Sequence, residues 1–201
     1  MLDVTRLRTL MVADTCAVWN ILSSARVHSQ SIAGGCLYSI TDFVIYECLS
    51  KPRKSNDAEA EELRDRLRRA RTQGQFQNYS LSVDDLLDVD LLEKRQRLSK
   101  GELTTIAFAR KTRQAIVTDD QGARMLASAE LGSSVVQTTP QLVGWLVFIG
   151  RLVDSELSAV VEEHTRFKRP LARFFREMYE EAMRCRLAAQ AATMSSDAQS
   201  P

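Results

Sequence analysis

The chain has 201 residues, of which 44% are hydrophobic and 26% are charged, and its net charge is +1. This composition suits one globular domain with a small addition, and it excludes a general electrostatic attraction to nucleic acid or anionic lipid. The longest apolar run, at 142–149, is much shorter than the roughly 20 residues that span a bilayer. The N-terminus has no basic and apolar segment of the secretory type, so we expect a soluble, cytoplasmic protein that does not contact a membrane.

Apolar, strand-like segments alternate with helical segments along the chain. Strands are expected at 9–13, 37–40, 79–83, 115–118 and 134–137, and helices at 15–24, 42–50, 58–71, 102–113, 121–129, 141–149 and 155–165. Several of the strands are continuous apolar runs, which is typical of parallel strands that are buried on both faces. The expected fold class is therefore α/β, with a parallel sheet of about five strands and helices on both faces.

The chain divides into a main domain and a C-terminal extension. The main domain is expected over 1–168, an amphipathic helix over 169–192, and a small, polar, disordered tail over 193–201. The extension carries an apolar stripe at helical spacing, formed by Leu171, Phe174, Phe175, Met178 and Tyr179. This stripe is too apolar to remain in water, so it packs on the domain, mediates a dimer, or receives a partner protein.

Four acidic residues lie where strands are expected to give way to helices: Asp14, Glu47, Glu102 and Asp120. The carboxyl ends of parallel strands meet at one edge of the sheet, where ligands bind. A group of buried acids needs a counter-ion, because an unpaired buried carboxylate is costly. Carboxylates suit Mg²⁺ or Mn²⁺, and the cysteines are scattered without a Cys-x-x-Cys pair, which argues against zinc.

Two of these acids also have a simple structural interpretation. Asp14 can cap the helix that follows it, and Glu102 completes the Ser-x-x-Glu spacing of a capping box with Ser99. Glu47 is harder to explain in this way, because apolar residues flank it.

The fourth acid belongs to an adjacent pair, Asp119 and Asp120, at the end of an apolar strand. One member of the pair is expected to cap the next helix and the other to face the site. Arg124, one helical turn further on, can form an ion pair with either of them.

The order of these acids resembles that of the PIN-domain nuclease superfamily, which includes the VapC-like toxins. The resemblance covers about residues 8–165 and depends on four motifs, namely Val12-Ala13-Asp14-Thr15, Ile45-Tyr46-Glu47, Gly101-Glu102-Leu103-Thr104-Thr105-Ile106-Ala107 and Thr118-Asp119-Asp120. The Gly-Glu form of the third motif and the Asp-Asp form of the fourth are similar to a less characterised PIN branch.

The resemblance implies a PIN-like, Rossmann-like sheet that holds Mg²⁺ or Mn²⁺ and an endoribonuclease that cuts single-stranded RNA. Its catalytic residues would be Asp14, Glu47, Glu102 and Asp120. Of these, Asp14, Glu102 and Asp120 would be metal ligands, while Glu47 would be a further ligand or would orient water.

Many PIN domains carry another acid or an asparagine two residues after the fourth aspartate, where this chain has Gly122. Asp119 is the candidate ligand that compensates for this departure.

Basic residues near the second acid are candidates for binding RNA phosphates. Lys51, Arg53 and Lys54 follow Glu47 by about one helical turn, and Thr15 adjoins the first acid. The arginines between 64 and 71 offer a second basic face, although the interleaved acids favour an ion-paired surface helix over a binding face.

Three functions remain open at this point. The first is a metal-dependent ribonuclease, with RNA as substrate, an antitoxin-like protein inhibitor as a partner, and a homodimer as the expected assembly. The second is a non-catalytic PIN-like scaffold that binds RNA or a protein. The third is a phosphoryl-transfer site of phosphatase or receiver type, which usually needs a lysine at a strand end, whereas Lys100 and Lys111 lie before or within a helix.

Overall fold

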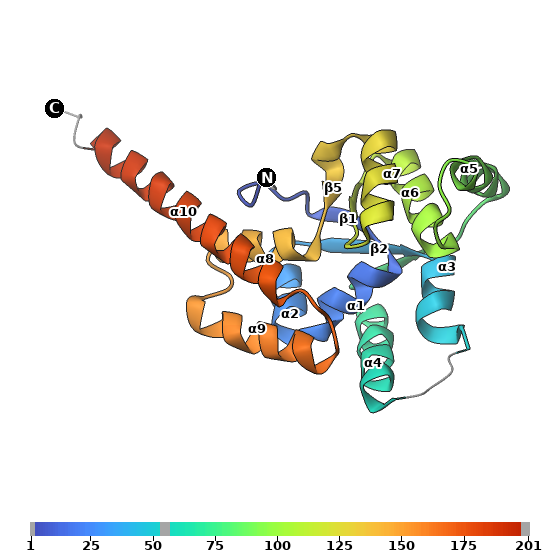
Figure 1. Ribbon diagram of the computed structural model, residues 1–201, viewed down its shortest axis with the longest axis horizontal. Helices are drawn as coiled ribbons and strands as arrows, with labels where there is room; N and C mark the ends of the chain where they lie inside the picture. The colour runs from blue at the N-terminus through green and yellow to red at the C-terminus, as the bar shows by residue number, and fades with distance from the viewer. Residues whose placement is uncertain (1–2, 53–56, 198–201) are drawn as a thin grey trace.

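The computed structural model describes residues 3–52 and 57–197 (Figure 1). The strands are β1 (Leu10–Ala13), β2 (Leu37–Thr41), β3 (Phe76–Tyr79), β4 (Ala115–Val117) and β5 (Val136–Gln137). The α-helices are α1 (Thr15–Ser23), α2 (Ala25–Ala33), α3 (Asp42–Ile45), α4 (Ala58–Thr72), α5 (Val83–Glu93), α6 (Lys100–Thr112), α7 (Gln121–Leu131), α8 (Thr139–Phe148), α9 (Asp154–Arg166) and α10 (Ala172–Asp197). A π-helical turn, η1 (Tyr46–Ser50), and a 3-10 turn, η2 (Ser133–Val135), complete the described elements.

The strands form one five-stranded, all-parallel sheet in the order β3-β2-β1-β4-β5. The expected α/β class with a parallel sheet is therefore confirmed. From β1 the chain adds β2 and then β3 on one side, and it then crosses over to add β4 and β5 on the other side. The direction of winding therefore reverses between β1 and β4. In sheets of this kind the crevice at that point, beyond the carboxyl ends of the strands, is the usual place for a ligand.

The sheet separates two hydrophobic cores, as expected for strands that are buried on both faces. Along β1, Met11 and Ala13 belong to the core beneath α1, α2, α4 and α8, whereas Val12 belongs to the core beneath α5, α6 and α7. The same alternation occurs in β4, where Ile116 faces the second core. Figure 1 shows these two groups of helices on opposite sides of the strands. Because successive side chains of a strand point to opposite faces of the sheet, a continuous apolar run contributes side chains to both hydrophobic cores.

The third strand lies earlier in the chain than the sequence predicts, at 76–79 instead of 79–83. Phe76 stacks on Tyr38 of β2, with ring centroids 5.0 Å apart, which fixes the strand register. Ser82 instead begins α5 through a capping box with Asp85. Neither α5 nor α2 is expected from the sequence, because α5 is dense in aspartate and α2 has few apolar residues to mark a helical face.

The C-terminal extension packs on the main domain through α8 and α9. Phe175 and Ala182 are buried in the first core, while Phe174 remains 47% exposed. Gly144 of α8 allows this close packing, because a Cβ there would lie 2.8 Å from Val4 and 3.0 Å from the Cβ of Met178. Helix α10 continues to Asp197, past the expected end of the helix at 192, and the remainder of the expected tail, 198–201, lies outside the described residues.

No helix in the described part of the chain is both long enough and apolar enough to cross a membrane.

Candidate functional site: an acid cluster at the carboxyl edge of the sheet

The structure brings five acidic residues to the carboxyl edge of the sheet around β1 and β4. We call this set the acid cluster, formed by Asp14, Glu47, Glu102, Asp119 and Asp120. Asp14 directly follows β1, and the aspartate pair follows β4, which pairs with β1 in parallel with Ala13 opposite Val117. Hydrogen bonds and mutual electrostatic effects connect the remaining members to these two strand ends, as described below.

Asp14 is completely buried, and both of its carboxylate oxygens accept hydrogen bonds. The backbone N–H of Ala17 donates to Oδ1 over 2.7 Å, so Asp14 caps α1 as the structural interpretation predicts. The hydroxyl of Thr118 donates to Oδ2 from the end of β4. The pKa of Asp14 is raised to about 7, mainly by burial and in smaller part by the negative charges of Asp119 and Glu102, while the two hydrogen bonds act in the opposite direction. The fold therefore holds a carboxylate where negative charge is unfavourable.

Glu47 extends from η1 to the N-terminus of α6. The hydroxyl of Thr15 donates to its Oε2 over 2.5 Å, and the backbone N–H of Gly101 donates to its Oε1 over 3.3 Å. A Cβ at position 101 would lie 2.4 Å from the Oε2 of Glu47, so only glycine permits this approach. The π-helical turn sets the direction of Glu47, and such turns are frequent at functional sites. The sequence predicts an ordinary helix there.

Glu102 combines two roles. Its Oε2 accepts the backbone N–H of Ser99 over 2.7 Å, and the Ser99 hydroxyl accepts the backbone N–H of Glu102, so the expected capping box is present. Burial raises the pKa of Glu102, and the nearby charges of Asp120 and Glu47 add to this effect. The capping box thus accounts for the position of one carboxylate oxygen of Glu102. The negative charges of Asp120 and Glu47 act on the same carboxylate.

The aspartate pair divides as the sequence suggests, with one member capping a helix. Asp120 accepts the backbone N–H of Ala123 over 2.8 Å and caps α7. Asp119 accepts the backbone N–H of Thr139 over 2.9 Å and the side-chain amide of Asn20 over 2.7 Å. The alternative in which Arg124 pairs with one of these aspartates is not observed, because the Arg124 side chain forms no ion pair with any described residue.

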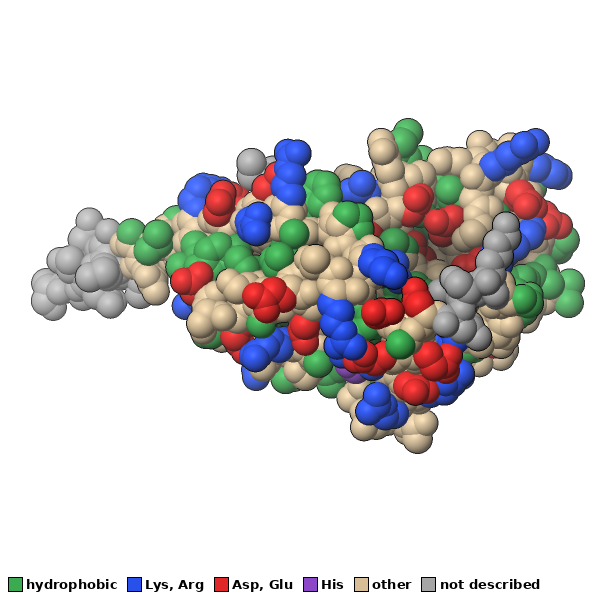
Figure 2. Space-filling model, turned by 60° about the horizontal axis from the view of Figure 1, so that its bottom comes forward, with side chains coloured by type: hydrophobic (Ala, Val, Ile, Leu, Met, Phe, Trp, Pro, Cys, Tyr) green, Lys and Arg blue, Asp and Glu red, His purple; other side chains and the backbone are tan. Residues whose placement is uncertain are grey.

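Helix N-termini surround these acids. Three cluster members are bound at the first turns of α1, α6 and α7, and Asp119 accepts a backbone N–H at the start of α8. The N-terminus of a helix carries a partial positive charge, which favours anionic groups there. Figure 2 shows acidic side chains gathered in a hollow between the region of α6 and α7 and the region of α4. The helix termini compensate part of the repulsion, yet the pKa values of Asp14 and Glu102 remain raised.

The chemistry of this donor set fits a hard divalent cation, because every side chain in it offers carboxylate oxygen. Glu102 and Asp120 each keep one oxygen that accepts no hydrogen bond from the described residues. As they stand, however, no three His, Cys, Asp or Glu side chains in the described ranges are grouped closely enough to enclose an ion. The adjacent thiol of Cys16 does not add a soft ligand, because burial raises its pKa to about 12.

The candidate substrate-binding residues are only partly placed. Thr15 contacts Glu47 and so belongs to the cluster, while Lys51 is exposed at the end of η1. Arg53 and Lys54 lie outside the described residues. The second basic face on α4 consists largely of ion pairs, in which Arg64 and Arg68 bind acids of the same helix.

The lysines that a receiver-type site would need are bound elsewhere. Lys100 forms an ion pair with Glu93, and Lys111 forms one with Asp85.

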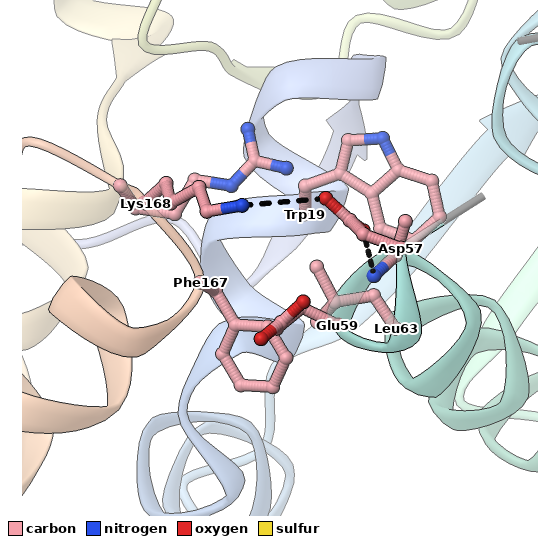
Figure 3. Close-up of a pocket in the computed structure, with 8 residues that line it drawn as sticks. Trp19, Asp57, Glu59, Leu63, Phe167 and Lys168 are labelled. Carbon is pink, nitrogen blue, oxygen red and sulfur yellow. Dashed lines mark hydrogen bonds and ion pairs between the residues drawn. The ribbon is translucent and has the colours of Figure 1, made fainter. Parts of the chain in front are cut away.

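A small pocket of about 120 Å³ lies between α1, α4 and the segment before α10 (Figure 3). Trp19, Leu63 and Phe167 form its apolar walls, and Lys168 reaches across its edge to Asp57, the cap of α4. None of the described candidate residues lines this pocket. It lies at a junction of helices, and no member of the acid cluster is among its described lining residues.

Several residues that hold the cluster were not assigned a role from the sequence. Thr118 and Thr139 bind Asp14 and Asp119, and Asn20 connects α1 to Asp119. A signal exists for Asn20, which is a polar residue within the apolar run Val18–Leu22 and is only 3% exposed. Buried polar residues of this kind need a hydrogen-bond partner.

Gly122 also has a packing explanation. A Cβ at this position would lie 2.9 Å from the side-chain amide of Gln96 and 3.2 Å from Oδ1 of Asp120. The loop before α6 therefore occupies the space that a larger side chain at 122 would need.

No protein-family model, no characterised protein and no solved structure matches this chain significantly. Membership of the PIN-domain superfamily therefore stays a prediction from the four sequence motifs.

Proposed function

We propose that this protein is a metal-dependent endoribonuclease of PIN type, with Mg²⁺ or Mn²⁺ held by the acid cluster. The observation that carries this proposal is the state of Asp14, a fully buried acid whose pKa is raised to about 7, in part by two neighbouring acids. Such a group is unfavourable for folding unless a positive charge comes near it. Perturbed carboxylates at a sheet switch point are typical of functional sites.

Asp14, Glu102 and Asp120 would hold the ion, with Asp119 or Glu47 as a further ligand. Once bound, such an ion supplies Lewis-acid assistance to phosphodiester hydrolysis and makes water more acidic. The chain itself fixes the ligands: Thr118 orients Asp14, Ser99 orients Glu102, and Thr139 with Asn20 orients Asp119. Glu47, which accepts hydrogen bonds from Thr15 and Gly101, would orient water if it is not itself a ligand.

Lys51, Arg53, Lys54 and Thr15 are the proposed contacts to RNA phosphates, which matter because the cluster itself repels a polyanion. An antitoxin-like inhibitor and a homodimer remain predicted partners of this activity.

The proposal is tested with end-labelled single-stranded and structured RNA incubated with Mn²⁺, with Mg²⁺ and with a chelator. Asp120→Asn and Glu102→Gln are the informative variants, because Asn caps a helix about as well as Asp and Gln can complete a capping box. Both keep the local fold and remove a charged ligand. Asp90→Asn on the exposed side of α5 is the control.

We expect metal-dependent cutting that falls on the order of 100-fold or more in the two cluster variants and is unchanged in the control. Cutting that is equal in wild type and Asp120→Asn would reject the proposal.

A second function is favoured by one observation, namely that Asp14, Glu102 and Asp120 each cap a helix. In a non-catalytic PIN-like scaffold that binds RNA or a protein, capping would be their whole role. The amide variants would then leave RNA or partner binding unchanged, and the wild-type protein would cut no RNA with any metal.

A further inference from the structure

A groove adjoins the acid cluster on the side of the C-terminal helix. It has a volume of about 240 Å³ and is bounded by Asp119 of the cluster, by Arg124 of α7, by the start of α8 and by α10. Glu177 of α10 also lines it and is paired with Arg173 of the same helix. Its apolar walls include Pro140, Phe174 and Met178. We call it the α10 groove, because α10 supplies Phe174 and Met178.

Arg124 is the charged group of this groove that has no assigned partner. Its Nε is buried and donates to no acceptor among the described residues, and its guanidinium forms no ion pair with them. Because the Nε has almost no accessible surface, an anion in the groove would meet the terminal nitrogens of the guanidinium, which form no ion pair with the described residues. Arg124 also lines a second, open depression of about 540 Å³ with Gln121 and Ser133, so a chain-like ligand could pass beside it.

Phe174 gives the groove an apolar face that the protein itself leaves open. Its side chain is 47% exposed, although Phe175, the next residue, is fully buried in the core. An exposed aromatic ring beside a cationic group is the combination that binds single-stranded nucleic acid, since bases stack on the ring and phosphates bind the cation.

We propose that the α10 groove binds the nucleotide next to the cleaved phosphodiester, with the Arg124 guanidinium on its phosphate and its base stacked on Phe174. This inference rests on the proposed ribonuclease function for the position of the cut, but the binding that it describes is measurable without cleavage. It gives α10, which lies beyond the part of the chain that resembles PIN domains, a role in holding the substrate.

The test measures the binding of fluorescently labelled single-stranded RNA to the full chain in chelator, by anisotropy at several salt concentrations. Arg124→Gln and Phe174→Ala are compared with Arg176→Gln and Leu187→Ala, two changes at exposed positions on the same C-terminal helix. Phe174→Trp serves as the conservative variant that keeps an aromatic face. Circular dichroism of each variant establishes that the fold is retained.

Phe174→Ala should weaken binding about ten-fold, and Phe174→Trp should restore it, as expected for loss and recovery of one stacked base. Arg124→Gln should reduce the slope of log affinity against log salt by roughly 0.7, the value for one phosphate contact to a single strand. The two control variants should bind as wild type does.

The inference is overturned if Arg124→Gln and Phe174→Ala bind RNA as tightly as wild type does. It is also overturned if the two control variants lose as much affinity for RNA as the two groove variants. If the protein binds RNA through this groove but cuts none with any metal, the proposed catalytic function fails while the groove assignment stands. If it cuts RNA and neither groove variant changes binding, the catalytic proposal stands and the groove assignment fails.

Discussion

Glu47 can approach the N-terminus of α6 only because residue 101 is glycine, which makes Gly101 a sensitive position in the site. An added Cβ would overlap the Glu47 carboxylate, at 2.4 Å from its Oε2. Alanine is otherwise favoured over glycine within a helix by up to about 1 kcal/mol, so Gly101→Ala should not unfold the protein.

We predict that Gly101→Ala lowers RNA cleavage by roughly 10- to 100-fold, the usual cost of disturbing a group that supports a metal site. Most of the effect should disappear in a Glu47→Ala background, because the overlap with the Glu47 carboxylate is then gone and only the 3.1 Å approach to the Thr15 hydroxyl remains. Cleavage rates of the two single variants and the double variant measure this coupling. Independent, multiplicative effects would show that Gly101 acts in some other way.

The buried carboxyl of Asp14 should make stability depend on pH. Its pKa is about 7 in the fold against 3.8 ordinarily, so the folded chain holds an extra proton between these values. This extra proton on Asp14 stabilises the folded state. Its contribution is complete below about pH 4 and is lost as pH rises through about 7, which changes the unfolding free energy by roughly 4 kcal/mol.

Urea unfolding in chelator should therefore show stability falling between about pH 4 and pH 7 in wild type, and a smaller fall in Asp14→Asn. Asn keeps the helix cap but has no proton to lose. Identical pH profiles for the two proteins would mean that Asp14 does not carry this penalty.

At the scale of elements, most of the sheet could be predicted from the sequence. Continuous apolar runs mark β1 and β4, since both faces of these strands are buried. The third strand was misplaced because a Ser-x-x-Asp capping box at Ser82 competes with an apparent strand pattern. The π-helical turn η1 could not be foreseen, because the hydrogen bonds that define it leave no distinct apolar period.

The candidate site could likewise be predicted only in part from the sequence. The positions of Asp14 and Asp120 follow from strand ends, which sequence patterns reveal. The supporting contacts of Thr118 and Asn20 depend on which elements become neighbours in space, and the sequence does not contain that information locally.

The junction of α8 and α10 should be intolerant of added volume. Gly144→Ala would place a methyl group 2.8 Å from Val4 and 3.0 Å from both the Cβ and the carbonyl of Met178. We predict a loss of about 1 to 3 kcal/mol in unfolding free energy, as for other overpacked interiors. Urea denaturation would measure it, with the exposed Ser158→Ala in α9 as control. A Gly144→Ala protein as stable as wild type would contradict this close packing.

At the scale of the whole molecule, the net charge is only +1, but the charged side chains are unevenly distributed. Acids gather at the carboxyl edge of the sheet, and helix N-termini surround them. Metal binding should then compete with protons, because a ligand such as Asp14 must be ionised to hold a cation.

The most direct test of the central claim, that the acid cluster is a divalent-cation site, is calorimetric titration with Mn²⁺ at pH 6, 7 and 8. We predict stoichiometric binding that tightens as pH rises through about 7, releases protons, and is lost in Glu102→Gln but not in Asp90→Asn. Absence of Mn²⁺ binding at every pH, or equal binding by wild type and Glu102→Gln, would contradict the claim.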